Sequence, residues 1–337
     1  MKHCNIAIFV PQAGCPHQCS FCDQRTITSQ QRLPGAGDVR CICEEAFREI
    51  SDLSETEIAF FGGSFTAIAH SYMRELLEAA EPYAKRCRGV RISTRPDAID
   101  EDILHMLHTY GVTAIELGVQ SMDDTVLEKN GRGHTAADVR RAVDLIREKG
   151  FELGMQLMPG LYGSSIDSDR RSAEAVCDLH PDTVRIYPVV ILEGTKLAEL
   201  YQSGEYRPIP FERMVSEVAE MMERFREEGI RIIKVGLHSS DLVEQKEIGG
   251  FYHPAFRELC ESRIFRNAIE MAVIGKDGMK WQDMYKIAVH PSSISKAIGQ
   301  KQENLRHFYE NYGTRMYIVP DKTVGKFECR IITEEKK

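Results

Sequence analysis

Short apolar segments alternate with longer amphipathic ones along the first 240 residues, and few folds accommodate that order. Strand-like segments lie at residues 6–11, 57–61, 90–96, 114–121, 153–161, 183–190 and 230–237. Apolar residues with helical spacing lie at residues 38–51, 71–86, 135–150, 168–179 and 211–225. Because strands that alternate with helices are typical of α/β proteins, we predict a fold of six βα-type repeats. A chain of 337 residues is long enough for one large α/β barrel and a smaller appended unit.

Three cysteines follow the first expected strand in a loop that contains glycine and proline. Cys15, Cys19 and Cys22 have the spacing C-x3-C-x2-C. Thiolates are the usual ligands of iron–sulfur clusters, and a cube of four irons has four corners. Three cysteines would hold three irons and leave the fourth open to a substrate or a cofactor. We therefore predict a [4Fe-4S] cluster bound by these residues.

Other uses of the cysteines remain as alternatives. Ten cysteines in 337 residues, without a signal peptide, are typical of a reduced cytosolic protein rather than of a disulfide framework. Structural zinc normally has four ligands, and Cys4, His3 and His17 are the nearby candidates for the fourth. A cluster with four cysteines would need Cys41 or Cys43, which lie beyond a loop in an expected helix.

With Phe21 directly before Cys22, the motif is C-x3-C-x-aromatic-C, and it resembles that of the radical S-adenosylmethionine enzymes. The loop is most similar to the branch that contains the Elongator catalytic subunit and the oxygen-independent coproporphyrinogen oxidases. The resemblance implies a partial (β/α)6 TIM-like barrel. It also implies that S-adenosylmethionine chelates the open iron, and that the reduced cluster cleaves it to a 5′-deoxyadenosyl radical.

The same resemblance implies which residues contact S-adenosylmethionine. The backbone of Gly62-Gly63-Ser64 matches the family segment that holds the methionyl amino group, although the family often has Glu where Ser64 stands. Arg132 matches an arginine that pairs with the carboxylate, a task that suits a planar guanidinium. The expected cofactor-binding residues are Phe21, Gly62, Gly63, Ser64, Thr94, Gln120, Arg132, Met158 and Tyr187. Taken alone, a double glycine is more often a turn, and a methionine is more often packing.

Polar residues at strand ends are the candidates for the substrate. Alternation along residues 114–121 places Glu116 and Gln120 on one side of the strand, and a buried carboxylate needs a partner. We therefore predict substrate contacts from Glu116, Arg185 and His238. The alternatives are that Glu116 only pairs with an arginine such as Arg95 or Arg185, and that His238 is structural.

A change of pattern after residue 249 predicts a second unit, so that residues 1–240 form the barrel and residues 249–337 a C-terminal α/β cap. Residues 284–332 have the order strand, helix, strand, strand. Residues 295–305 and 314–318 resemble a KH-type RNA-binding segment, but Gln302 stands where the second glycine of Gly-x-x-Gly belongs. From residue 285 onward there are ten Lys or Arg and six Asp or Glu. The cap either binds RNA or closes the barrel.

Composition limits the location and the partners. No apolar run is long enough to span a bilayer, so we expect a soluble cytoplasmic protein without a membrane partner. The net charge of −8 fits a small modified base better than a whole tRNA. A low-potential donor such as flavodoxin or ferredoxin is expected to reduce the cluster. No segment resembles the acetyltransferase domain of the Elongator subunit, so acetyl-CoA chemistry is not expected.

The predicted function is that of a radical S-adenosylmethionine enzyme acting on a nucleobase-type substrate. Resemblance favours tRNA modification, or salvage of a modified base by a lyase such as a queuine lyase, which is among the relatives of similar domain length. Two alternatives stay open. One is an RNA-binding regulator with a structural metal, and the other is a radical enzyme acting on a porphyrin-like substrate.

Overall fold

The computed structural model describes residues 4–11, 15, 18–23, 32–277 and 280–332. The chain divides into two compact units. The first unit comprises Met1–Ile209 and Arg224–Tyr252, and the second comprises Pro210–Glu223 and His253–Lys337. The expected domain limits, 1–240 and 249–337, stay a prediction.

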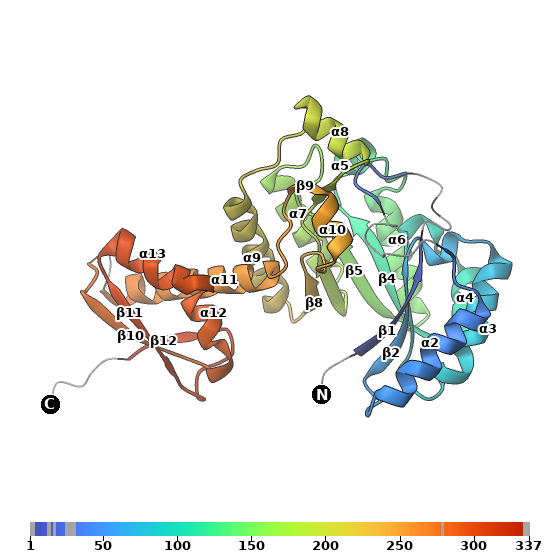
Figure 1. Ribbon diagram of the computed structural model, residues 1–337, viewed down its shortest axis with the longest axis horizontal. Coiled ribbons are helices and arrows are strands. Elements are labelled where there is room, and N and C mark those ends of the chain that lie inside the picture. The colour runs from blue at the N-terminus through green and yellow to red at the C-terminus, as the bar shows by residue number, and fades with distance from the viewer. Residues whose placement is uncertain (1–3, 12–14, 16–17, 24–31, 278–279, 333–337) are drawn as a thin grey trace. The chain divides into compact units, whose positions relative to one another are not determined.

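The first unit is built on a sheet of seven parallel strands (Figure 1). In spatial order the strands are β1 (Cys4–Val10), β2 (Thr56–Gly62), β3 (Gly89–Thr94), β4 (Val112–Gln120), β5 (Glu152–Leu157), β6 (Thr183–Ile186) and β8 (Arg231–Val235). Each neighbouring pair is parallel. The predicted α/β partial barrel is confirmed.

Helices connect the parallel strands, as parallel neighbours require. They are α2 (Ala36–Glu49), α3 (His70–Ala84), α4 (Glu101–Thr109), α5 (Asp124–Lys129), α6 (Ala136–Glu148), α7 (Ile166–Asp178), α8 (Lys196–Ser203) and α9 (Phe211–Glu227), although most of α9 belongs to the second unit. A further helix, α10 (Asp241–Lys246), follows β8, the last strand of the sheet. In Figure 1, α2, α3, α4 and α6 lie along one side of the sheet. Side chains on β1 alternate accordingly, because Ile6 and Ile8 are buried whereas Phe9 faces a cavity.

The sequence predicts the start of one helix correctly and that of another incorrectly. Thr135 caps α6 as expected, and its hydroxyl accepts a hydrogen bond from the Asp138 amide. Asp38, which the sequence suggests as the cap of α2, lies three residues inside the helix instead. Its carboxylate accepts a hydrogen bond from the Gly35 amide at 2.9 Å, which is the reverse half of a capping box.

The fifth and sixth strands are shorter than the sequence predicts. β5 ends at Leu157 rather than at residue 161, because Pro159 cannot donate a ladder hydrogen bond and Gly160 has φ +84°. β6 ends at Ile186, two residues before Pro188. The following β7 (Val190–Leu192) leaves the main sheet and pairs antiparallel with β9 (Glu247–Gly250).

The second unit has its own sheet and its own core. Its elements from residue 256 onward are α11 (Phe256–Asp277), β10 (Met284–Val289), α12 (Ile294–Ile298), α13 (Glu303–Tyr312), β11 (Arg315–Pro320) and β12 (Cys329–Ile331). The strand order is β11-β10-β12, with β10 parallel to β11 and antiparallel to β12. Phe265, Ile269 and Val273 of α11 pack with Ile287 and Phe308 in the core.

Two helices stand where the sequence predicts one, between β10 and β11. They are separated at Gly299, which has φ +80°, and by Lys301 and Gln302, which both have positive φ. None of the described helices is both long and apolar enough to cross a membrane.

Candidate active site

A cavity of about 440 Å³ opens within the first unit, at the carboxyl ends of the parallel strands. Barrel enzymes carry their active sites at this end. Side chains from β1, β2, β3, β4, β5, β6 and β8 line it together with the cysteine loop. The cavity brings together every residue predicted from the sequence to contact cofactor or substrate: Phe21, Gly62, Gly63, Ser64, Thr94, Glu116, Gln120, Arg132, Met158, Arg185, Tyr187 and His238.

The cysteine loop is fixed from behind by Asn130, which is fully buried. The Ser20 amide donates to the Asn130 carbonyl at 3.0 Å, and the Ser20 hydroxyl donates to Asn130 Oδ1 at 2.6 Å. The Leu197 amide donates to the Ser20 carbonyl at 2.7 Å. These bonds join the loop to segments that lie far away in the sequence, so the positions of the cysteines depend on the folded barrel.

The three thiols lie close enough to influence one another, and they differ in exposure: Cys15 is exposed, Cys22 is intermediate and Cys19 is buried. Cys15 and Cys22 line the cavity, whereas Cys19 is buried beside Arg132. Burial, followed by the negative charge of Cys19 and Cys15, raises the pKa of Cys22 to about 12. A cationic iron cluster would remove this repulsion, because metals bind thiolates.

The donor set suits an iron–sulfur cluster, because all three donors are cysteine thiols. Among the described residues, no three Cys, His, Asp or Glu side chains converge closely enough to surround one metal ion. The thiolates of a cluster occupy separate corners. His3 and His17, the candidates for a zinc ligand, lie outside the described residues. Cys41 and Cys43 lie in α2 as expected.

Arg132 reaches from the loop after α5 into the cysteine site. Its Nη1 donates to Cys19 Sγ at 3.3 Å, and its Nη2 donates to the Gly118 carbonyl at 2.6 Å. Its buried Nε has no hydrogen-bond partner among the described residues. A buried guanidinium nitrogen without a partner is costly, which indicates that a bound group completes the site.

Gly62 and Gly63 close the end of β2 against β1. Gly62 has φ +112°, and a Cβ there would lie 3.0 Å from the Val10 carbonyl oxygen. The Gly63 amide donates to that carbonyl at 2.9 Å. Ser64 Oγ lies 4.0 Å from Cys15 Sγ. The double glycine therefore brings bare backbone to the cavity beside a cysteine.

Gln120 ends β4 with φ +66°, next to a register shift in the β4–β5 ladder. Its Oε1 accepts a hydrogen bond from Gln156 Nε2 at 3.0 Å. Gly118 leaves room for this side chain, because a Cβ there would lie 2.9 Å from Gln120 Nε2. The bulge turns the amide into the cavity.

An ion pair crosses the floor of the cavity. Arg185 Nε donates to Glu116 Oε2 at 2.5 Å, and Arg185 Nη1 donates to the Tyr187 hydroxyl at 3.2 Å. The guanidinium also lies 5.1 Å from the centre of the Phe61 ring. Burial raises the pKa of the Tyr187 phenol, so it stays neutral. The pairing of Glu116 with Arg185, an alternative left open by the sequence, is thus present within the cavity.

Thr94 and Met158, which the sequence predicts as cofactor contacts, already make polar contacts within the protein, and the nearby His134 is structural. The Thr94 hydroxyl lies 2.6 Å from the Thr66 hydroxyl. The Met158 amide donates to the Gln120 carbonyl at 2.9 Å, so its side chain is placed by the β4–β5 junction. His134 is buried with Nε2 at 3.2 Å from the Val119 carbonyl, and it packs the loop rather than the cavity.

Sequence reasoning missed three residues that shape this site. Gln156 could have been found by alternation with Met158 along the fifth strand. Phe61 stands directly before the double glycine, but nothing local indicates that it stacks on Arg185. Asn130 lies 110 residues from Ser20, and no local pattern predicts that contact.

The half-barrel and its cysteine-bearing cavity define a class of enzyme. Residues 9–175 match the Radical SAM superfamily, and residues 181–266 match the Radical_SAM C-terminal domain. The chain therefore belongs to the radical S-adenosylmethionine superfamily and is an enzyme of that class. The family implies a [4Fe-4S] cluster and S-adenosylmethionine.

Among its relatives are tRNA-modifying proteins. A tRNA uridine(34) acetyltransferase of Methanocaldococcus infernus is 27% identical over 256 residues, covering 64% of this chain and 48% of the relative. An uncharacterized protein of Methanocaldococcus jannaschii is 30% identical over 223 residues, covering 62% of this chain and 68% of that protein. The chain spans only 28% to 55% of three acetyltransferase relatives.

Solved structures agree on the fold. The archaeal Methanocaldococcus infernus Elp3, with an N-terminal deletion, superposes with a TM-score of 0.64. The match covers 82% of this chain and 67% of that one, at 22% sequence identity. The likeness supports the half-barrel architecture.

Proposed function

We propose that this enzyme reductively cleaves S-adenosylmethionine and abstracts a hydrogen atom from a nucleobase in an RNA substrate, with tRNA as the first candidate. The observation that carries the proposal is the convergence of the cysteine loop, the bare Gly62-Gly63 backbone and Arg132 on one cavity. The cluster and S-adenosylmethionine supply the radical when they are bound.

The residues of the chain divide the work by their chemistry. Cys15, Cys19 and Cys22 would hold the cluster. The Gly62-Gly63 backbone suits an ammonium group, and the partly unsatisfied guanidinium of Arg132 suits a carboxylate. Together they would fix the amino-acid end of S-adenosylmethionine next to the thiolates.

The other half of the cavity is left for the substrate. Phe61 and the Glu116–Arg185 pair form a polar, partly aromatic wall that could receive a planar base. His238 and Lys234 line the same cavity from the end of β8. Holding one C–H bond against the radical carbon, away from water, is the contribution of the protein.

The relatives favour a base in tRNA over a free base. Those named for their activity modify uridine 34 of tRNA, although this chain covers about half of the first of them or less. The acetyltransferase activity for which these relatives are named is not part of the proposal for this chain. None of the relatives reported above is named as a lyase or for an action on queuine, so the free-base variant has no support from their names. A cytoplasmic location and a flavodoxin-like or ferredoxin-like donor remain part of the proposal.

The other two hypotheses have less support. A porphyrin-like substrate calls for several free arginines, but two of the three described arginines that line the cavity are already paired with carboxylates. Arg95 pairs with Asp97, Arg185 pairs with Glu116, and Arg132 binds the Gly118 carbonyl. A purely RNA-binding regulator would not need the cavity.

Anaerobic reconstitution tests the proposal. Wild-type protein with iron, sulfide and dithionite is expected to turn S-adenosylmethionine into 5′-deoxyadenosine, measured by mass spectrometry. Adding tRNA should raise that yield and change the mass of one nucleoside, whereas free deazapurine bases should not. Stimulation by a free base and not by tRNA would overturn the choice of substrate.

The control is a matched pair of cysteine variants. Cys19→Ala should lose the brown colour and all 5′-deoxyadenosine. Cys43→Ala, at a buried position of α2, should keep both. If Cys19→Ala retains cluster absorbance and turnover, the assignment of ligands is wrong.

A further inference from the structure

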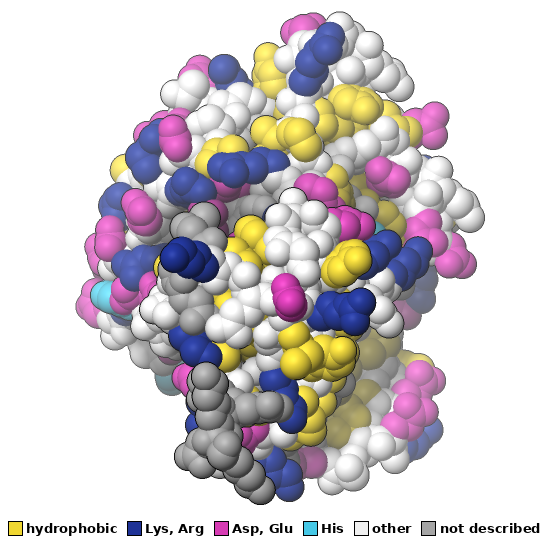
Figure 2. Space-filling model, turned by 90° about the vertical axis from the view of Figure 1, so that its left-hand side faces the viewer, with side chains coloured by type: hydrophobic (Ala, Val, Ile, Leu, Met, Phe, Trp, Pro, Cys, Tyr) yellow, Lys and Arg dark blue, Asp and Glu magenta, His cyan; other side chains and the backbone are white. Residues whose placement is uncertain are grey.

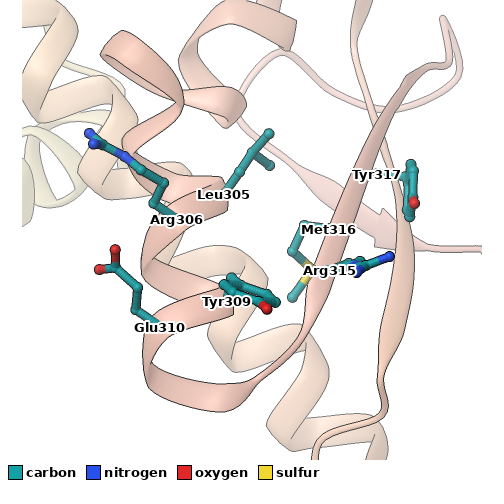
Figure 3. Close-up of a pocket in the computed structure, with 7 residues that line it drawn as sticks. All are labelled: Leu305, Arg306, Tyr309, Glu310, Arg315, Met316 and Tyr317. Atoms are coloured by element: carbon teal, nitrogen blue, oxygen red, sulfur yellow. The ribbon is translucent and has the colours of Figure 1, made fainter.

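A shallow hollow of about 320 Å³ lies on the second unit, where α13 passes the edge strand β11. Leu305, Arg306, Tyr309 and Glu310 line it from α13, and Arg315, Met316 and Tyr317 line it from β11. Figure 3 shows Tyr309 reaching from the helix toward the strand, with Tyr317 on the other side of that strand. We call these residues the α13–β11 groove.

The two tyrosines are unusually exposed for large aromatic side chains. Tyr309 is 57% exposed and Tyr317 is 50% exposed, whereas their neighbours Phe308 and Met316 are buried in the core. Packing therefore does not account for the two rings. An exposed ring held on a helix or a strand is a preorganised stacking surface.

Two arginines and one glutamate line the groove, so its charged side chains carry a net charge of +1 that favours an anionic partner. Arg306 and Arg315 are exposed, and neither guanidinium has an ion pair with a described residue. Other arginines of the unit are paired: Arg266 with Glu303 and Arg330 with Asp321. The side of the molecule that carries α13 faces the viewer in Figure 2, where Lys and Arg side chains lie next to hydrophobic ones.

We infer that the α13–β11 groove binds single-stranded RNA, with bases stacked on Tyr309 and Tyr317 and phosphates paired with Arg306 and Arg315. Aromatic rings beside unpaired cations are the combination that single-stranded nucleic acid recognises. Two platforms on either side of an edge strand suit successive bases of an extended chain better than one deeply bound base. The groove is remote in sequence from the cysteine loop, so it adds a docking site to the proposed function.

The groove overlaps the residues that resemble a KH segment, but it does not use the loop at Gly299. That loop lacks the second glycine, and Gln302 occupies its place with φ +61°. The stacking and charged groups of the groove follow the loop in the sequence, on α13 and β11. A peptide that adds a strand to β11 is the competing occupant. Such a peptide would use the backbone edge and would have no need of exposed aromatic rings.

Fluorescence anisotropy with the full-length holoenzyme tests the inference. The probe is a labelled unstructured RNA of roughly 12 nucleotides, within the range for such sites. Tyr309→Ala and Tyr317→Ala should each weaken binding about tenfold, whereas Tyr309→Phe and Tyr317→Phe should change it less than about twofold. Met271→Ala, at an exposed position of α11, is the control for losing surface apolar area.

Salt dependence tests the phosphate contacts separately. Arg306→Gln combined with Arg315→Gln should lower the slope of log K against log salt by about 1.4, since each phosphate contact contributes about 0.7 on a single strand. Arg330→Gln, on β12 at the opposite edge of the sheet, should leave that slope unchanged.

Two outcomes overturn the inference. One is binding by Tyr309→Ala/Tyr317→Ala that equals wild type. The other is no binding by the wild-type protein at low salt, which would leave the groove to a protein segment. The assay contains neither S-adenosylmethionine nor reductant, so its result bears on this surface alone. Failure of the proposed radical reaction would leave the anisotropy unchanged.

Discussion

At the scale of single residues, the site depends on side chains that are each held by a partner from another element. Arg132 binds both Cys19 and the β4 backbone, and Arg185 is held between Glu116 and Phe61. Three energetic consequences of such contacts can be measured without turnover.

Replacing Arg132 should make the cluster harder to reduce. The guanidinium donates to Cys19 Sγ, and positive charge near a ligand sulfur stabilises the reduced cluster. If the hydrogen bond is about 1.5 kcal/mol stronger in the reduced cluster than in the oxidised one, the midpoint potential of Arg132→Gln falls by about 60 mV. Redox titration followed by electron paramagnetic resonance measures this. An unchanged potential would mean that the contact is lost when the cluster is present.

Removing Glu116 should destabilise the fold, because it leaves the Arg185 charge in a poorly solvated place. We expect Glu116→Gln to cost about 2 to 3 kcal/mol, somewhat below the value for a fully buried pair because the cavity admits water. Urea unfolding at pH 7.5 measures it. Glu116→Gln combined with Arg185→Met should recover most of the loss, and a single variant as stable as wild type would contradict the argument.

His134 should contribute a pH-dependent component of stability. Burial, followed by the charge of Arg132, lowers the pKa of His134 from 6.5 to about 4. The unfolded chain therefore binds the proton more tightly, and this stability is complete above pH 6.5 and is lost as pH falls toward 4. The loss at pH 4.5 should be about 2 to 3 kcal/mol. His134→Gln should remove that part of the difference in unfolding free energy between pH 7 and 4.5, and an equal acid loss in both proteins would refute it.

At the scale of elements, the strand ends place the site. β2 ends in a double glycine, β4 ends in a bulge, and β6 ends two residues before Pro188. Each device stops the regular ladder and turns a backbone or side-chain group toward the cavity. The end of β2 has the strictest steric requirement.

Adding one methyl group to two different glycines should have opposite effects. Gly62→Ala puts a Cβ against the Val10 carbonyl at positive φ, so we expect a cost of about 1 to 3 kcal/mol. Gly37→Ala, in α2 with open space around the Cβ, should stabilise by about 0.5 to 1 kcal/mol. Thermal unfolding of the two variants compares them. A neutral Gly62→Ala would mean that the β1–β2 ends relax freely.

At the scale of the whole molecule, the two proposed functions fall in different units. The cysteine cavity lies entirely in the first unit, and the α13–β11 groove lies entirely in the second. An acidic chain with a locally basic C-terminal segment can confine RNA contacts to one surface.

A crossed pair of variants should separate the two functions. Cys19→Ala is expected to lose the cluster absorbance and still bind the labelled RNA with wild-type affinity. Tyr309→Ala/Tyr317→Ala is expected to lose RNA affinity and keep the visible absorbance of the cluster, about as strong as in wild type. Anisotropy and visible spectra, recorded on the same preparations, measure both. Loss of RNA binding by Cys19→Ala would place RNA contacts at the cavity as well.

The order of strands and helices and the three cysteines could be predicted because both are local patterns. Apolar periodicity records which face of each segment is buried, so the βα alternation and Thr135 as a cap were predictable. The ends of the strands were harder to predict, because Pro159 and Pro188 stop the hydrogen-bond ladder of the sheet within apolar segments that otherwise continue. The sequence likewise predicts one helix where the structure has two, α12 and α13, because the break at Gly299 interrupts a segment that otherwise continues.

The amino-acid sequence alone determined the class of fold and indicated the candidate cluster ligands, since periodicity and ligand spacing need no distant partner. Only the tertiary structure decided which groups meet. Arg132 contacts Cys19 across 113 residues, Asn130 holds Ser20, and Glu116 is paired with Arg185. The register of the sheet and the order of its strands set these contacts, and neither can be predicted from one segment of the sequence. Likewise, only the tertiary structure shows that Tyr309 and Tyr317 of the α13–β11 groove are exposed while their neighbours Phe308 and Met316 are buried in the core.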